Sequence, residues 1–213
     1  MDIVLNESEV RILGCLIEKE MTTPEYYPLS SNSLTNACNQ KSNRDPVLIY
    51  EEAVVSQGLD SLQEKGLARK THTAGSRVPK YLHTVLDKFD LSGQEMAILC
   101  ELMLRGPQTV GEIRTHAERM SPFHSLEEVE KNLRALIDYD PALAIKLPRE
   151  SGRKECRYMH LFSGGIMQDL PVGSAAYRSP AEERISRLEE ETARLRNELE
   201  DLKQTFAEFK SQF

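Results

Sequence analysis

The chain reads Glu9-Val10-Arg11-Ile12-Leu13 near its start and Glu95-Met96-Ala97-Ile98-Leu99 further along, with an offset of 86 residues. The apolar positions of both stretches are three or four residues apart, and the pattern continues to Ile17 in the first copy and Met103 in the second. Such spacings place side chains on one face of an α-helix. We therefore expect two copies of the same helix, each burying one face.

The same order of elements follows each of these helices. A short helix comes first, then a longer amphipathic helix, then a basic stretch with turn residues at its middle that is typical of a β-hairpin. In the first copy we expect helices over about 6–20, 31–39 and 51–65 and a hairpin over 68–84. In the second copy we expect helices that start near 92, 109 and 125 and a hairpin over 143–162.

This order predicts two tandem winged-helix domains, so the expected fold class is mainly α with small β-hairpins (α+β). We place the first domain at 1–88 and the second at 89–163. A stretch that contains Gly, Pro and Ser and lacks periodicity predicts a linker at 164–179. A C-terminal coiled-coil helix is expected at 180–213.

Capping residues support the helix starts. Asn6 stands three residues before Glu9, and Ser92 stands three residues before Glu95, which is the spacing of a capping box. Thr109 with Glu112 and Ser125 with Glu128 repeat the pattern. We expect these four helix starts to share the same cap chemistry.

Composition limits the class of protein. The chain has 213 residues with 39% hydrophobic and 29% charged residues, and 27 Lys and Arg against 34 Asp and Glu give a net charge of −7. Any contact with nucleic acid must therefore come from a local basic patch. No apolar run approaches the roughly 20 residues that span a bilayer, and no signal peptide is evident. We expect a cytoplasmic protein without membrane contact.

The cysteines predict neither a metal site nor a cofactor. Cys15, Cys38, Cys100 and Cys156 lie far apart, without a C-x-x-C pair or a histidine at ligand spacing. We interpret them as structural thiols. Glycine-rich phosphate loops and nucleophile motifs are also lacking, so we do not expect an enzyme.

The last helix changes its apolar period to seven, which favours a coiled coil. The expected contact residues are Ile185, Leu188, Leu195, Leu199, Leu202, Phe206 and Phe209. In a parallel pair, Glu191 faces Arg196 of the other chain and Glu198 faces Lys203, both with opposite charges. The pattern therefore favours a parallel homodimer, and the alternative is that the helix folds back on its own domain.

Several long stretches resemble the YceH-like proteins, a bacterial family of tandem winged-helix proteins. They are LGCLIEKE at 13–20, TTPEYYPL at 22–29, NACNQKSNRDP at 36–46, RVPKY at 77–81 and LRGPQT at 104–109. These stretches are specific and come from both copies. The resemblance implies the fold, and it implies no particular activity, ligand or partner.

Charge is divided between the helices and the hairpins. The third helix of each copy carries Glu51, Glu52, Asp60 and Glu64 in one case and Glu127, Glu128, Glu130 and Asp138 in the other. Carboxylates repel phosphates, so deep insertion of these helices into a DNA groove is not expected. The hairpins instead carry Arg69, Lys70, Arg77 and Lys80 in the first copy and Lys146, Arg149, Arg153, Lys154 and Arg157 in the second.

The loop between the second and third helices is another candidate site. Lys41 and Arg44 stand just before the third helix, where they are placed to clamp a phosphate or an acidic partner. The alternative is local turn chemistry, which explains Asn43 and Asp45 but not the two cations.

Two functions follow. The first is a dimeric tandem winged-helix protein associated with DNA, such as a transcriptional regulator, that contacts the phosphate backbone through its basic hairpins. The alternative is a winged-helix interaction module or scaffold that binds an unknown protein partner and no DNA, through the acidic helices and the coiled coil.

Overall fold

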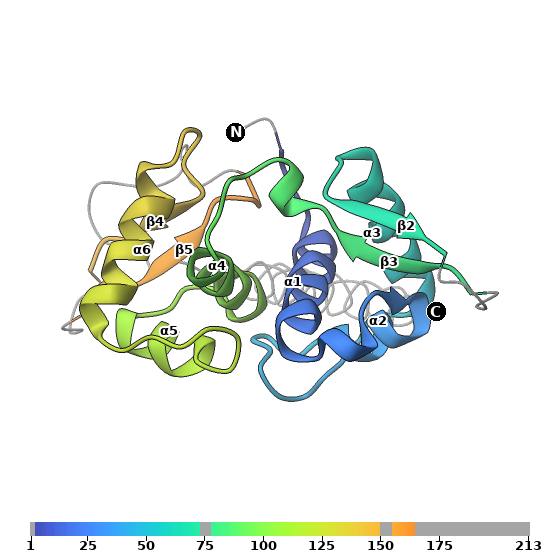
Figure 1. Cartoon of the computed structure of the whole chain (residues 1–213), viewed down its shortest axis with the longest axis horizontal. Coiled ribbons are helices and arrows are strands. Elements are labelled where there is room, and N and C mark those ends of the chain that lie inside the picture. Colours follow the sequence, from blue (N-terminus) through green and yellow to red (C-terminus); the bar gives the residue numbers. More distant parts are fainter. Residues whose placement is uncertain (1–2, 73–77, 150–154, 165–213) are drawn as a thin grey trace, which may run out of the picture. The chain divides into compact units, whose positions relative to one another are not determined.

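The structure is a computed structural model that describes residues 3–72, 78–149 and 155–164. The chain forms two compact units, Met1–Val172 and Gly173–Phe213, and all described residues belong to the first. These residues form an α+β fold with six α-helices and small antiparallel sheets, which confirms the expected class at that level (Figure 1). The predicted coiled-coil helix, and the predicted linker from residue 165 on, lie outside the described residues.

The first copy of the repeat contains three α-helices and three strands. They are α1 (Glu7–Thr22), β1 (Leu29–Ser30), α2 (Ser31–Cys38), α3 (Glu52–Glu64), β2 (Ala68–Thr71) and β3 (Lys80–His83), with the 3-10 helices η1 (Pro24–Tyr26) after α1 and η2 (Val85–Asp87) after β3. The strands form an antiparallel sheet in the order β1-β3-β2, in which Leu29 pairs with Tyr81 and Ala68 with His83.

The second copy repeats this order. It contains α4 (Gly93–Arg105), α5 (Val110–Ala117), α6 (Leu126–Asp138), β4 (Ala144–Lys146) and β5 (Tyr158–His160). In place of a third strand, the second copy has a single β-bridge between Gln108 and Tyr158. The Gln108 N–H donates to the Tyr158 carbonyl at 3.0 Å, and the Tyr158 N–H donates to the Gln108 carbonyl at 2.7 Å. The bridge lies beside β5 as β1 lies beside β3, so the pairing order of the two copies agrees.

The predicted caps form at the helix starts. Asn6 Oδ1 accepts from the Glu9 N–H at 2.9 Å, and Glu9 Oε2 accepts from the Asn6 N–H at 2.8 Å. The same reciprocal box starts α4 and α5, with Ser92 and Glu95 and with Thr109 and Glu112. Only half of it forms at α6, where Ser125 accepts from the Glu128 N–H but the Glu128 carboxylate accepts from His124.

Helix α1 packs against α2 and α3 of its own copy and against α4 of the second copy (Figure 1). Every residue from Glu9 to Glu18 is buried, so the middle of α1 is covered on all sides and not on one face as its spacing predicts. A Cβ atom at Gly14 would lie 2.9 Å from Leu104 Cδ2 and 3.3 Å from Met103 Cβ. Glycine therefore allows the close approach of α1 to α4.

The two copies share one hydrophobic core. The Leu5 N–H, at the start of the first copy, donates to the Phe162 carbonyl at the end of the second at 2.7 Å. Phe162 packs edge-on against Phe89, with ring centroids 5.7 Å apart. The boundary predicted at residue 88 thus separates the copies in sequence, while the core continues across it.

Candidate nucleic-acid interface and buried ion-pair cluster

The first hairpin, β2 and β3, presents three described cations. Arg69 and Lys70 are exposed and Lys80 is half-buried. Because Arg69 pairs with Leu82 and Lys80 pairs with Thr71, Arg69 and Lys80 are diagonal neighbours on the face opposite the buried residues of the sheet. Within the described residues, none of the three cations has a carboxylate at ion-pair distance.

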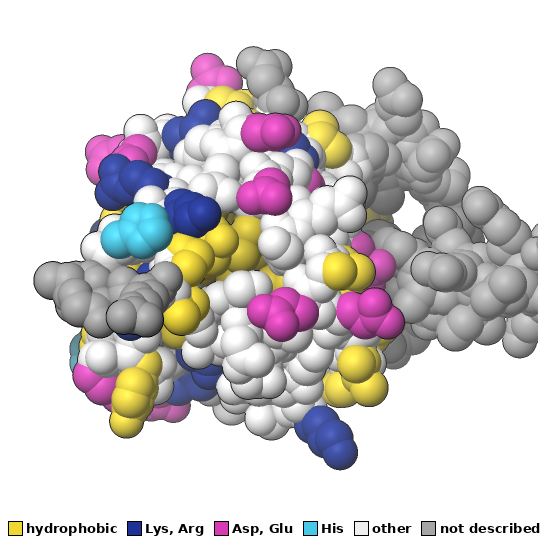
Figure 2. All heavy atoms as spheres, turned by 90° about the vertical axis from the view of Figure 1, so that its right-hand side faces the viewer, with side chains coloured by type: hydrophobic (Ala, Val, Ile, Leu, Met, Phe, Trp, Pro, Cys, Tyr) yellow, Lys and Arg dark blue, Asp and Glu magenta, His cyan; other side chains and the backbone are white. Residues whose placement is uncertain are grey.

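Figure 2 views the end of the unit that carries this hairpin, and it shows Lys and Arg side chains gathered beside a histidine. Acidic side chains are more widely spread over the same face. The predicted site residue Arg77 lies outside the described residues. Among the described residues, the predicted cations of the first hairpin are therefore not paired with a carboxylate.

The second hairpin, β4 and β5, differs from the first. Lys146 and Arg149 are exposed, and Lys146 Nζ lies 5.8 Å from the centre of the Tyr158 ring. Arg157 is bound within the protein, since its Nη1 donates to the Pro107 carbonyl at 2.6 Å and lies 3.0 Å from Glu112 Oε2. The prediction that Arg157 faces nucleic acid needs correction, because the start of α5 already neutralises it. Arg153 and Lys154 lie outside the described residues.

The two cations of the predicted phosphate clamp in the loop 39–46 differ in exposure. Lys41 is exposed, whereas Arg44 is only 5% exposed and its side chain is fully covered. The assignment of Arg44 to an external phosphate is therefore wrong. Its guanidinium is used inside the protein, where leaving a charge without a partner would be costly.

The outer face of α3, the third helix of the first copy, is acidic. Glu51, Glu52, Asp60 and Glu64 of the first copy are all exposed. The cation at the end of α3, Lys65, is held by Glu9, with Nζ 2.6 Å from Oε2 and 2.7 Å from Oε1. This pairing removes the one positive side chain that the end of this helix offers.

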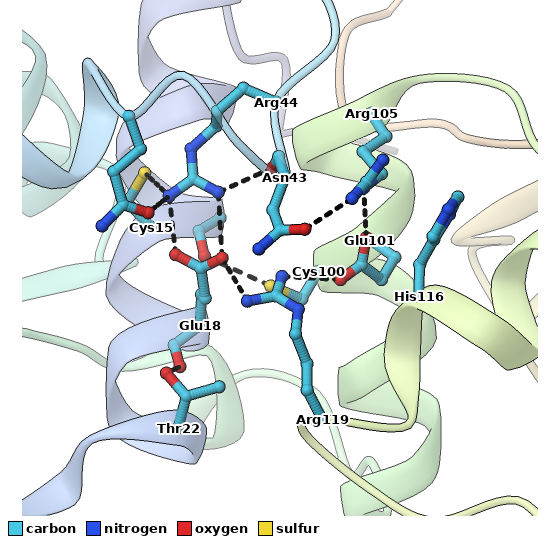
Figure 3. Close-up of polar contacts among 12 residues, drawn as sticks. Cys15, Glu18, Thr22, Asn43, Arg44, Cys100, Glu101, Arg105, His116 and Arg119 are labelled. Atoms are coloured by element: carbon cyan, nitrogen blue, oxygen red, sulfur yellow. Dashed lines mark hydrogen bonds and ion pairs between the residues drawn. The ribbon is translucent and has the colours of Figure 1, made fainter.

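Glu18 and Glu101 lie at the centre of a buried ion-pair cluster, which we define as Glu18, Arg44, Glu101, Arg105 and Arg119 (Figure 3). Both carboxylates are fully buried. Arg44 binds Glu18 with two hydrogen bonds of 2.9 and 2.6 Å. Arg119, which follows α5, reaches Glu18 Oε1 and Glu101 Oε1 at 2.7 Å each. One arginine thus links α1 of the first copy to α4 of the second.

Arg105 fastens the loop 39–46 to the second copy. Its Nε lies 3.2 Å from Glu101 Oε2, and its Nη2 donates to Asn43 Oδ1 at 2.6 Å (Figure 3). The Asp45 N–H also donates to the Leu104 carbonyl at 3.0 Å. The loop that the sequence suggests as a binding surface therefore largely forms contacts between the first and second copies.

The two buried carboxylates differ in pKa. Burial alone raises the pKa of Glu18, but the hydrogen bonds and charge of Arg44 and the charge of Arg119 outweigh it, so the pKa lies below its ordinary value. Burial also raises the pKa of Glu101, and there the contacts with Arg119 and Arg105 do not compensate fully. Glu18 is the more firmly ionised of the two.

Sequence reasoning missed this cluster because a spacing rule connects only two of its members, Glu101 and Arg105, which are four residues apart on α4. One sign was available, since Glu101 is a single acid within the apolar stretch Met96–Leu104. Such an acid is buried only with a partner. The identity of the partner depends on the fold, because Arg119 follows the next helix.

Membrane spans and metal sites are both absent from the described ranges. No helix among these residues has the length and apolar character needed to cross a bilayer. No group of three or more His, Cys, Asp and Glu side chains in the same ranges is arranged to hold a metal ion.

Comparison with known proteins gives matches along the whole chain. Residues 5–153 match the family described as "Protein of unknown function, DUF480". A "UPF0502 protein" of Geotalea uraniireducens is 53% identical over 219 aligned positions, and one of Geotalea daltonii is 55% identical over 218, each covering 100% of both chains. One of Pelobacter propionicus is 50% identical, also over 100% of both chains. The resemblance to a bacterial family is thereby confirmed.

Proposed function

We propose that this chain, which belongs to the bacterial DUF480 family, is a non-enzymatic tandem winged-helix protein that contacts the phosphate backbone of nucleic acid through its basic hairpins. The order of helices and strands in the first copy, with the sheet order β1-β3-β2, supports the winged-helix assignment. Winged helices belong to the helix-turn-helix proteins, whose recognition helix enters the major groove of DNA.

The observation that carries the proposal is the set of free cations on the first hairpin. Arg69, Lys70 and Lys80 lie on one hairpin of an acidic protein without an intramolecular carboxylate among the described residues. Cations that stabilise a fold are normally paired, as Arg157 and Lys65 are here. Free cations on neighbouring strands favour contact with an external polyanion.

The contact is with backbone phosphates and not with base edges. The exposed acids Glu51, Glu52 and Asp60 on α3 would repel phosphates if that helix entered a groove. Because Arg157 is neutralised by Glu112, the first hairpin contributes more than the second. We further propose that the C-terminal helix pairs two chains in parallel, so that each dimer presents two such hairpins.

A salt titration with a random-sequence duplex tests the proposal. Fluorescence anisotropy of a labelled duplex yields the slope of log K against log salt concentration, which changes by about 0.9 for each phosphate that a cation neutralises. The variant Arg69→Ala/Lys70→Ala/Lys80→Ala should weaken binding and flatten this slope by about 0.9 for each phosphate that the variant no longer binds.

The matched control is Lys88→Ala/Lys131→Ala/Arg134→Ala, which removes the same charge from exposed positions outside the hairpins. It should leave the slope nearly unchanged. Equally weakened binding by both variants would show a general charge effect and not a hairpin site. Lack of binding by the unchanged chain at low salt would overturn the proposal.

An exposed apolar segment favours the alternative function as a protein-interaction module. Val47 is 52% exposed and Ile49 is 88% exposed, just before the acidic start of α3. The test compares proteins captured from cell extract by the unchanged chain, by Val47→Ser/Ile49→Ser and by the hairpin triple variant. A protein that fails to bind only the serine variant supports this alternative, and a capture pattern shared by all three chains contradicts it.

A further inference from the structure

The segment 46–51, which we call the edge segment, leads from the loop after α2 into α3 (Figure 1). It belongs to no helix or strand, yet its exposure alternates from residue to residue. The half-buried residues are Pro46, Leu48 and Tyr50, and the exposed residues are Val47, Ile49 and Glu51. A period of two is typical of a β-strand that lies with one face on the protein. The Glu51 backbone, with φ of −73° and ψ of 152°, is extended as well.

Side chains hold both ends of the edge segment. At its start, Arg11 Nη2 donates to the Pro46 carbonyl at 2.7 Å. Near its end, Asn39 Oδ1 accepts from the Tyr50 N–H at 2.7 Å, and Asn39 Nδ2 donates to the Tyr50 carbonyl at 2.9 Å. Because the segment is already fixed in this way, it loses little conformational entropy when a ligand binds to it.

The contact with Asn39 also determines which way the backbone faces. In extended backbone, the N–H and C=O of one residue point to the same side, and those of the next residue point to the other side. Since both groups of Tyr50 point to Asn39, both groups of Ile49 and of Val47 point away from it. Within the described residues, the N–H and C=O groups of Val47, Leu48 and Ile49 form no hydrogen bond. Val47 and Ile49 therefore form a free strand edge.

Acidic side chains flank the two exposed aliphatic residues. Asp45 precedes the edge segment, Glu51 ends it and Glu52 follows, and all three acids are exposed. Among the described residues, none of these acids has a cation at ion-pair distance. If two copies of the segment paired in antiparallel fashion, with Val47 facing Ile49, then Asp45 would face Glu51, and the like charges would repel. The edge therefore fits a strand with Lys or Arg at its ends better than a second copy of itself.

We propose that the edge segment binds an extended peptide of a protein partner, which adds a β-strand along Val47 and Ile49. The peptide backbone pairs with the free N–H and C=O groups of these two residues, and aliphatic or β-branched side chains of the peptide cover their exposed side chains. Basic residues at the peptide ends pair with the flanking acids. This inference deepens the protein-interaction role given above as the alternative function and rests on it, and it does not depend on contact with nucleic acid.

A library of random decapeptides displayed on phage, selected on the full chain, tests the partner chemistry. We expect enrichment of sequences with aliphatic or β-branched residues at alternate positions and with Lys or Arg near the ends. Enrichment of peptides with acidic ends, which resemble the edge segment itself, would favour a second copy as the occupant and overturn the proposal. Apolar residues at helical spacing in the enriched peptides, or no enrichment, would overturn it as well.

N-methylation of the peptide that binds best tests strand addition directly. Each backbone amide of the peptide is methylated in turn, which removes one N–H and leaves the side chains unchanged. Methylation of the amides that face the edge segment should weaken binding by about tenfold, whereas methylation of the amides between them should change it little. Fluorescence anisotropy of the labelled peptide measures both effects. A loss of affinity that is uniform along the peptide would contradict strand addition.

Variants of the edge segment test the same geometry from the side of the protein. Ile49→Pro removes an outward N–H at a position where an edge strand tolerates proline, and it should weaken binding of the peptide by about tenfold. Ile49→Val keeps the N–H and should bind nearly as well as the unchanged chain. Urea unfolding establishes that both variants are folded. Undiminished binding by folded Ile49→Pro would overturn the proposal.

The acids have a matched pair of variants. Glu51→Gln/Glu52→Gln should weaken binding of a lysine-flanked peptide by about fivefold. Asp60→Asn/Glu64→Gln removes the same charge from exposed positions near the other end of α3 and should leave the affinity nearly unchanged. Equal effects of the two variants would contradict the predicted ion pairs. If capture from cell extract requires Val47 and Ile49 but methylation shows no alternation, the interaction role stands and strand addition is wrong.

Discussion

Cys100 and Gly14 stand at equivalent positions of the repeat and contact each other, with Cys100 Sγ donating to the Gly14 carbonyl at 3.3 Å. A residue that meets its own counterpart lies close to a two-fold axis, as in the isologous interface of a symmetric dimer. The contact between α1 and α4 therefore resembles a dimer interface whose two subunits are joined in one chain. Because both halves of this interface belong to one chain, their amino-acid sequences can differ.

The ion-pair cluster shows this difference. Glu18 corresponds to Leu104 in the second copy, and Glu101 corresponds to Cys15 in the first. Each buried carboxylate thus has an apolar residue or a thiol as its counterpart. Two of the three arginines that pair with these carboxylates, Arg44 and Arg119, lie outside α1 and α4. Only this arrangement of the two copies gives both buried carboxylates their partners.

Gly14 controls the approach of α1 to α4. In Gly14→Ala the new Cβ would lie within 3.3 Å of the Met103 Cβ, and we expect a loss of about 1–3 kcal/mol in the free energy of unfolding. The matched control is Gly111→Ala in α5, where the added Cβ has no neighbour within 4 Å. That change should increase stability by up to about 1 kcal/mol. Urea unfolding measures both, and a neutral Gly14→Ala would contradict tight packing.

Arg44 is expected to be structural and not a phosphate ligand. Arg44→Met leaves the buried Glu18 carboxylate without its main partner and should reduce stability by about 3–5 kcal/mol. Lys41→Met, three residues earlier and exposed, should change stability by less than about 0.5 kcal/mol. Chemical denaturation distinguishes the two. Similar small effects would show that Arg44 contributes little to the fold.

The ion pair between Lys65 and Glu9 predicts a pH-dependent effect. Burial raises the pKa of Glu9, but hydrogen bonds from Lys65, Ser61 and Asn6 outweigh it and lower the pKa below 4.5. The stabilisation by ionised Glu9 is therefore complete above pH 4.5 and is lost as the pH falls through the lowered value. Lys65→Met should cost about 1–2 kcal/mol at neutral pH and much less at a pH below the lowered pKa of Glu9.

Lys41→Met serves again as the control, because Lys41 has no ion pair among the described residues. Its stability should follow that of the unchanged chain at both pH values. A deficit of Lys65→Met that is the same at both pH values would contradict the assigned ion pair.

The shared core predicts cooperative folding of the two copies. A fragment of residues 1–88 exposes the side of α1 that packs against α4, including Gly14 and the Glu18 carboxylate. We expect this fragment to unfold without a cooperative transition in circular dichroism, whereas residues 1–172 unfold in a single transition. A stable, cooperative fragment would establish the first copy as an independent domain.

The proposed parallel dimer has a charge-reversal test. Glu191→Lys/Glu198→Lys should weaken the dimer, and the further changes Arg196→Glu/Lys203→Glu should restore it, because both facing pairs regain opposite charges. Light scattering on the full chain and on a chain that ends at Gly173 measures the mass. Monomer mass for both chains would contradict the coiled coil, and lack of restoration would contradict the parallel orientation.

The helices were predictable because their signals are local. Asn6 and Glu9 cap α1, and Ser92 and Glu95 cap α4, through contacts within three residues of sequence. The chain reversal after α3 was likewise predictable from Gly66, whose φ of +66° favours glycine. Which of the cations would form an ion pair within the protein was not predictable. Arg69 and Arg157 both belong to basic hairpins, yet only Arg157 meets a carboxylate among the described residues.

The sequence by itself determined the repeat, the helix boundaries and the hairpins, since periodicity, caps and turn residues act over a few positions. Only the tertiary structure decided that α1 is covered on all sides, that Arg44 is enclosed with Glu18, and that Arg119 reaches Glu18 and Glu101 together. The physical reason is that burial and ion pairing depend on which distant segments meet. The same arginine is a free ligand for phosphate on a surface and a fixed internal cation between packed helices.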